Sequence, residues 1–154
     1  MPKLSANVNF QRAFFIRRLF MKRTQEREQA FIMVFEKEFN SEVDTGDLFA
    51  YAYEVGNFEK SDFCELLVKA VFENIEKIDG IISEYAVGWK INHLPKVTLA
   101  ILRLALCEIL YVDSIPESVT VNEAVELAKT YGGESDASYI NGILGKFLRD
   151  GRDE

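Results

Sequence analysis

The stretch Val97–Tyr111 is apolar at almost every position, and only Thr98, Arg103 and Glu108 within it are strongly polar. A helix that is apolar nearly all round needs packing partners on several sides. Burial of roughly ten large side chains, at ~1.5–3 kcal/mol each, outweighs any helix-propensity term. Arg103 and Glu108 are five residues apart, about 140° around the axis, so each needs a partner on another element. The pattern predicts a buried central helix that begins at Pro95.

Apolar residues recur at helical spacing on both sides of this stretch. The sequence predicts further helices over Thr24–Phe39, Asp47–Val55, Ser61 or Asp62 to Tyr85, Thr120 to about Tyr131, and Ser135 or Asp136 to about residue 150. Gly80 is the expected interruption of the third of these. Thr120 to Glu123 has the pattern of a capping box, and Gly132 is expected to be a left-handed residue that ends the helix before it. Since no segment alternates convincingly, the predicted fold is all-α, a compact bundle of about six to seven helices.

Charge is distributed unevenly along the 154 residues, a length that suits one domain. The net charge of −7 argues against a protein that coats nucleic acid generally. Residues 1–35 nevertheless carry a net charge of +5, so that the remainder carries −12. The basic residues of this leading part are Lys3, Arg12, Arg17, Arg18, Lys22, Arg23 and Arg27. This distribution is compatible with a localised anion-binding surface. It is equally compatible with a solvated end whose charge is incidental.

Residues 1–20 contain no acidic residue, and their phenylalanines lie among arginines. Such an N-terminal segment is typical of an organellar transit peptide. It also fits an extension upstream of a translation start at Met21. We favour an extension that packs poorly, which leaves residues 21–150 as the helical domain. Cys64 and Cys107 lie in apolar helical stretches, which favours buried free thiols in a reducing cytoplasm over a disulfide. No apolar run approaches the ~18 residues of a membrane span, so no membrane association is predicted.

The residues needed for catalysis are scarce. His93 is the only histidine, and a pairing of His93 with either cysteine has no support in the sequence. Clustered Cys and His ligands for zinc are missing, and no glycine-rich phosphate loop occurs. We therefore expect a protein that is not an enzyme, with no catalytic residue, no metal site and no cofactor.

Three segments in order carry a resemblance to a known family: LRLALCEIL at Leu102–Leu110, VTVNEAVELAK at Val119–Lys129, and YINGIL at Tyr139–Leu144. Their order and spacing resemble those of the NusB family of bacterial transcription antitermination factors. Met21 to Ala30 is also similar to the start of that family, where an arginine-rich motif precedes R-E-x-A. The resemblance covers Met21 to about Arg149.

The resemblance implies an all-helical RNA-binding domain with two helical subdomains. Its implied partners are boxA-containing RNA, the small-subunit ribosomal protein NusE and the RNA polymerase elongation complex, in antitermination and ribosomal RNA transcription. Some members dimerise, so a homodimer is a further expectation. The RNA-binding candidates carried over by motif are Lys22, Arg23 and Arg27 for phosphates, Phe35 and Tyr139 for stacking on bases, and Asn141 for a base edge.

Each candidate also has a purely structural interpretation. Phe35 and Tyr139 lie on apolar stripes and suit core packing, and the cations suit an ordinary solvated surface. Asn141 suits a side-chain-to-backbone bond that ties a helix end. The arginine-rich motif is thin, because Thr24, Gln25 and Glu26 separate its two arginines, which predicts weak RNA binding without NusE. A NusB-like interaction module without RNA binding is therefore the alternative. NusB-like domains also precede catalytic domains in RNA cytosine methyltransferases, but this sequence has no methyl-donor glycine loop.

Overall fold

The computed structural model describes residues 22–56 and 58–150. Those residues form helices joined by turns and include no strand, which confirms the all-α prediction. Residues 1–20, the predicted extension, lie outside the described ranges. None of the described helices is long and apolar enough to cross a membrane. The helices are residues 22–39, α2 (Thr45–Val55), α3 (Asp62–Glu73), α4 (Ile75–Tyr85), the short 3-10 helix η1 (Ile91–His93), α5 (Lys96–Tyr111), α6 (Glu117–Tyr131) and α7 (Glu134–Asp150).

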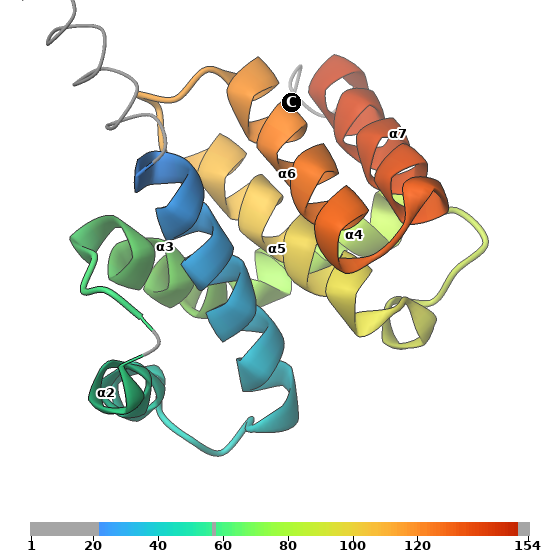
Figure 1. Cartoon of the computed structure of the whole chain (residues 1–154). Coiled ribbons are helices and arrows are strands. Elements are labelled where there is room, and N and C mark those ends of the chain that lie inside the picture. Colours follow the sequence, from blue (N-terminus) through green and yellow to red (C-terminus); the bar gives the residue numbers. More distant parts are fainter. Residues whose placement is uncertain (1–21, 57, 151–154) are drawn as a thin grey trace, which may run out of the picture.

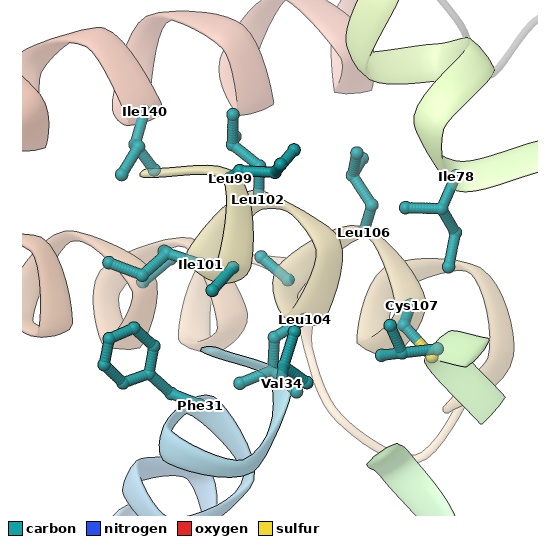
Figure 2. Close-up of a cluster of buried hydrophobic side chains, with 14 of the residues drawn as sticks. Phe31, Val34, Ile78, Leu99, Ile101, Leu102, Leu104, Leu106, Cys107 and Ile140 are labelled. Carbon is teal, nitrogen blue, oxygen red and sulfur yellow. The ribbon is translucent and has the colours of Figure 1, made fainter. Parts of the chain in front are cut away.

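Helix α5 is the centre of the bundle (Figure 1). All of its residues from Thr98 to Glu108 are buried, as the apolar pattern predicts. Figure 2 shows side chains of the 22–39 helix, α4 and α7 converging on α5, with Phe31, Ile78 and Ile140 among them. Helix α2 lies at the margin of the molecule beside α3 (Figure 1). The central helix therefore packs directly against α3, α4, α6 and α7 and positions their surfaces.

The buried carboxylate of Glu108 joins three helices. The Arg27 guanidinium of the 22–39 helix donates to it through Nε, at 3.0 and 3.1 Å from the two oxygens, and through Nη2 at 2.7 Å. The Thr120 hydroxyl of α6 donates to the same carboxylate at 3.0 Å. Arg27 is 4% exposed and Glu108 2%, so water does not share these bonds. This cluster fixes the 22–39 helix and α6 against α5.

Arg103, the other buried charged residue of α5, also has partners on other helices. Its Nε and Nη2 atoms each lie 2.9 Å from a carboxylate oxygen of Asp79 in α4. Its Nη1 atom lies 2.8 Å from Glu38, which also accepts from Lys96 at 3.0 Å. Partial burial acts to raise the pKa of Glu38, but the hydrogen bonds from Arg103 and Lys96 lower it. Both buried charged residues of α5, Arg103 and Glu108, thus pair with other elements, as predicted.

The predicted long helix from residue 61 to Tyr85 is two helices, and the break is at Asn74 instead of Gly80. Asn74 ends α3, and its side-chain Nδ2 donates to the Ala70 carbonyl at 2.8 Å. An asparagine that bonds locally to the backbone competes with the helical ladder. Gly80 continues inside α4 with open space around its Cα. At the other end, Ser61 is the N-cap, and its hydroxyl accepts from the Cys64 N–H at 3.1 Å.

Helix α6 ends at Tyr131, as predicted, but its beginning and the conformation of Gly132 differ from the prediction. The helix begins at Glu117, so Thr120 and Glu123 lie inside it and form no capping box. Thr120 bonds to Glu108 instead, and Glu123 accepts from the Thr24 hydroxyl at 3.1 Å. Gly132 has φ −120° and is not left-handed. A Cβ at this position would lie 3.0 Å from the Ala128 carbonyl oxygen, so close approach explains the glycine.

Both cysteines are buried free thiols, as predicted. Burial raises the pKa of Cys64 to about 12 and the pKa of Cys107 to about 12. The Cys107 thiol lies 3.8 Å from the Leu67 carbonyl oxygen and joins α5 to α3. Neither thiol has nucleophilic character at neutral pH, because only the thiolate reacts.

We predict that Arg27→Ala lowers the free energy of unfolding by about 3–5 kcal/mol, because it leaves the Glu108 charge buried without its partner. Urea unfolding followed by circular dichroism measures this change. Lys69→Ala is the control, since the Lys69–Glu73 pair is 3.9 Å long and its side chains are 67% and 62% exposed. Its loss changes stability by less than about 1 kcal/mol. A similar small effect of Arg27→Ala would contradict a structural role of the buried pair.

We also predict that stability falls above about pH 9. The folded state holds the thiol protons of Cys64 and Cys107 more tightly than the unfolded chain, where thiols titrate near pH 9. Their contribution is therefore complete below about pH 9 and is lost as the pH rises toward 12. Urea unfolding at several pH values measures the decline, and it should be shallower in the double variant Cys64→Ala/Cys107→Ala. Equal slopes for the two proteins would contradict the prediction.

Candidate nucleic-acid interface

Arg27 is not part of the surface, which corrects the sequence-based assignment of a phosphate contact to it. Its guanidinium is buried and hydrogen-bonded to Glu108. A phosphate could reach it only after the buried pair had separated, which leaves a charge without its partner in the core. The motif residue that resembles part of an RNA-binding sequence is thus a core residue in this fold.

Lys22 and Arg23 lie at the beginning of the 22–39 helix and are exposed. The Arg23 side chain is 45% exposed and forms an ion pair with Glu26 at 3.3 Å. Its guanidinium carbon lies 3.9 Å from the centre of the Phe63 ring in α3. Exposed ion pairs of this kind contribute little and exchange partners readily. Both cations can therefore reach a phosphate.

A polar hollow adjoins these two cations. Its lining includes Lys22, Glu26 and Phe63, together with Asp62 at the start of α3 and Lys60 and Ser61 just before it. Lys60 is exposed and adds a third cation to this end of the molecule. The sequence analysis missed Lys60, because it lies far from the arginine-rich motif in the chain and close to it only in the fold.

Phe35 is part of a row of aromatic rings along the 22–39 helix. The ring centres of Phe31 and Phe35 are 6.2 Å apart, and those of Phe35 and Phe39 are 5.1 Å apart. Tyr131, at the end of α6, extends the row, with its ring centre 4.9 Å from that of Phe31. Phe39 is 61% exposed and Tyr131 39%. The row therefore has exposed rings at both ends and a half-buried Phe35 between them.

Phe39 and Tyr131 were missed as candidates by the sequence analysis. The spacing of Phe31, Phe35 and Phe39 places three rings on one helix face, and that signal was available. The approach of Tyr131 depends on how α6 packs and has no local signal. The Tyr131 hydroxyl donates to Glu28 at 2.9 Å, and burial together with this bond raises the pKa of Tyr131.

Tyr139 and Asn141 both lie on α7, but they differ in how accessible their side chains are to a ligand. Tyr139 is half-buried against the core. Its hydroxyl oxygen is inaccessible and has no hydrogen-bond partner among the described residues, and burial raises its pKa. Asn141 is exposed, and the space around the neighbouring Gly142 is open. Of the two, Asn141 is the side chain that a ligand can reach without rearrangement.

The remaining candidates lie on two sides of α6. Figure 1 shows α6 between the 22–39 helix and α7, so Lys22 and Arg23 do not form one cluster with Tyr139 and Asn141. Along the 22–39 helix, Phe35 lies twelve residues, or about 18 Å, beyond Arg23. A strand that contacts both cations and rings must therefore follow an extended path over the surface.

Residues 24–149 match the model of a protein family described as the NusB family. The chain belongs to the NusB family. It is 43% identical over 128 residues to a transcription antitermination protein NusB of Natranaerobius thermophilus, covering 80% of this chain and 92% of the relative. It is 45% identical over 114 residues to the NusB of Acetivibrio thermocellus, covering 74% and 73%. The family is one of transcription antitermination factors and not of enzymes, which confirms that part of the sequence analysis.

Solved NusB structures have the same fold as this chain. The NusB of T. maritima matches with a TM-score of 0.74 and 32% identity, covering 83% of this chain and 91% of that one. A NusB crystallised with NusE in complex with dsRNA matches with a TM-score of 0.74 and 26% identity, covering 82% and 96%. The recognised motifs thus indicated both the family and the helical fold correctly.

The buried Tyr139 hydroxyl, which lacks a hydrogen-bond partner among the described residues, leads to a prediction about stability. Tyr139→Phe removes a buried polar atom that has no partner among the described residues, so we expect the free energy of unfolding to stay equal or to rise by up to about 1 kcal/mol. Tyr53→Phe is the matched control, because the Tyr53 hydroxyl donates to Glu65 at 3.0 Å. Its loss should cost about 0.5–1.5 kcal/mol. Urea unfolding of both variants measures the difference, and a larger cost for Tyr139→Phe would mean that its hydroxyl has a partner in solution.

Proposed function

We propose that this chain binds boxA-type RNA together with NusE, as part of the RNA polymerase elongation complex. In this role it supports antitermination during ribosomal RNA transcription, and its place of action is the cytoplasm. The main support is the match of residues 24–149 to the NusB family, together with a solved complex of a NusB with NusE and dsRNA that has the same fold. The domain that carries the function is the helical part from Met21 to about residue 150, and residues 1–20 are an extension outside it.

Phosphate binding is assigned to Lys22 and Arg23, with Lys60 beside them. Both motif cations are exposed, and Arg23 is held toward α3 by the Phe63 ring. A cation stacked on a ring keeps its outer face and its remaining N–H donors available to an anion. This end of the 22–39 helix thus supplies the salt-dependent part of RNA affinity.

Base contacts are assigned to the aromatic row and to α7. Exposed rings stack on unpaired bases at ~1–3 kcal/mol per base, and Phe35 with its exposed neighbours Phe39 and Tyr131 offers such rings. Asn141 can pair with a base edge through its amide, because it is exposed. Tyr139 serves mainly to support the α7 surface beside Asn141, since its hydroxyl is buried.

Two motif cations give weak RNA binding without a partner. Each phosphate contact on a single strand changes the slope of log affinity against log salt by about 0.7, so Lys22 and Arg23 together account for about 1.4. Because Arg27 is buried and paired with Glu108, the protein depends on NusE to complete the RNA-binding surface. The burial of Arg27 also favours the alternative, a NusB-like module that acts only through protein contacts. Pairing of two copies, which the family resemblance implies, is measured by sedimentation of the free protein.

We predict that Lys22→Ala/Arg23→Ala lowers the affinity for a boxA oligonucleotide and flattens its salt slope by about 1.4. Fluorescence anisotropy titrations at several salt concentrations, with and without NusE, measure both quantities. Lys90→Ala/Lys146→Ala is the matched control, because it removes the same charge from exposed positions elsewhere. Its slope should remain that of the unmodified protein.

The results of these titrations distinguish RNA binding by this chain from a role through protein contacts alone. If Lys22→Ala/Arg23→Ala binds RNA with an unchanged salt slope, these two cations are not part of the RNA-binding site. NusE binding without any RNA binding, at every salt concentration, would favour the protein-interaction module.

A further inference from the structure

An apolar groove lies between α3 and the last turn of α5. It has a volume of about 430 Å³, and its lining includes Phe63, Leu66, Leu67, Ala70, Tyr111 and Val112. Leu66 is 68% exposed and Tyr111 40%. An exposed leucine alone is ordinary, but this one borders a hollow that is apolar over most of its length. The groove adjoins, at Phe63, the polar hollow beside the cations assigned above to RNA phosphates.

The chain enters the described structure at one end of this groove. Arg23 lies against the ring of Phe63, and Phe63 lines the groove as well as the polar hollow that contains Lys22. Whatever precedes Lys22 is therefore attached beside the Phe63 end. The lining of α3 runs from there to Glu73, ten residues or about 15 Å further along the helix axis.

The preceding residues have the composition that such a groove requires. Residues 1–20 contain six large apolar residues near their end: Phe10, Phe14, Phe15, Ile16, Leu19 and Phe20. They also carry four basic residues and no acidic one, whereas the rest of the chain carries a net charge of −11. Asp62 lies near one end of the groove and Glu73 at the other, so carboxylates are available to the arginines between the phenylalanines.

We propose that the segment Phe10–Phe20 of this chain docks into the α3–α5 groove. A segment tethered at Lys22 is present at an effective concentration in the millimolar range, whereas a second copy or another protein must be recruited from solution. Its reach is sufficient, since eleven extended residues span up to about 36 Å. Docking would cover Leu66 and Tyr111 with the apolar side chains of the segment and bring its arginines near the carboxylates at the rim.

A paramagnetic label on the full-length protein tests the docking. Ala13→Cys introduces a thiol for a nitroxide, and the native cysteines do not compete because both are buried. The nitroxide should broaden the NMR signals of Leu66 and Tyr111 but not those of Val87, which is 74% exposed on the turn after α4. Equal broadening at Leu66 and Val87, or none at either, would overturn the proposal.

Variants and mixtures identify the occupant. Leu66→Asp should abolish the broadening at Tyr111, and Val87→Asp, an equally exposed site elsewhere, should leave it unchanged. Circular dichroism confirms that both variants keep the fold. In a mixture, nitroxide-bearing protein should not broaden Leu66 of isotope-labelled protein that lacks the nitroxide. Broadening in the mixture would show that a second copy occupies the groove, and broadening that survives Leu66→Asp would also contradict the proposal.

Discussion

The fold depends on how α5 accommodates charge inside an apolar core. A helix that is buried on all sides cannot leave a carboxylate or a guanidinium without a partner, because the cost of desolvation is several kcal/mol per ion. Glu108 meets this constraint with Arg27 and Thr120, and Arg103 with Asp79 and Glu38. Apolar contacts hold neighbouring helices against α5 without specifying their register. We infer that the buried charged residues help to specify this register, since each must keep its partner within hydrogen-bonding distance.

The same constraint shapes the surface that is available to RNA. Arg27 belongs to a motif that resembles an RNA-binding sequence, yet its side chain is buried in the core and hydrogen-bonded to Glu108. The exposed cations that remain at the start of the 22–39 helix are Lys22 and Arg23, and Lys60, just before α3, lies beside them. In a chain with a net charge of −7, so few cations give a local attraction and no general affinity for nucleic acid. This arrangement suits a factor that works in an assembly, where a partner completes the binding surface.

Local sequence signals were reliable where a residue's role depends on its own helix. The apolar stripes gave the helices and their order, and the buried thiols followed from their apolar surroundings. The signals failed where a side chain had a competing tertiary partner. Thr120 and Glu123 have the right spacing for a capping box, but Glu108 and Thr24 bind them instead. The break at Asn74 follows from a side-chain bond to the Ala70 carbonyl, which the flexibility of Gly80 does not predict.

The sequence by itself determined the fold class, the central helix and the family, because these follow from apolar periodicity and from motifs that are contiguous in the chain. The need of Arg103 and Glu108 for distant partners was also evident from their spacing. Only the tertiary structure decided which residues those partners are. It therefore also decided that Arg27 is internal, that Tyr131 joins the aromatic row, and that α6 separates Arg23 from Asn141. The physical reason is that exposure and pairing depend on neighbours from other helices, and a single helix pattern shows a residue's face but not what packs against it.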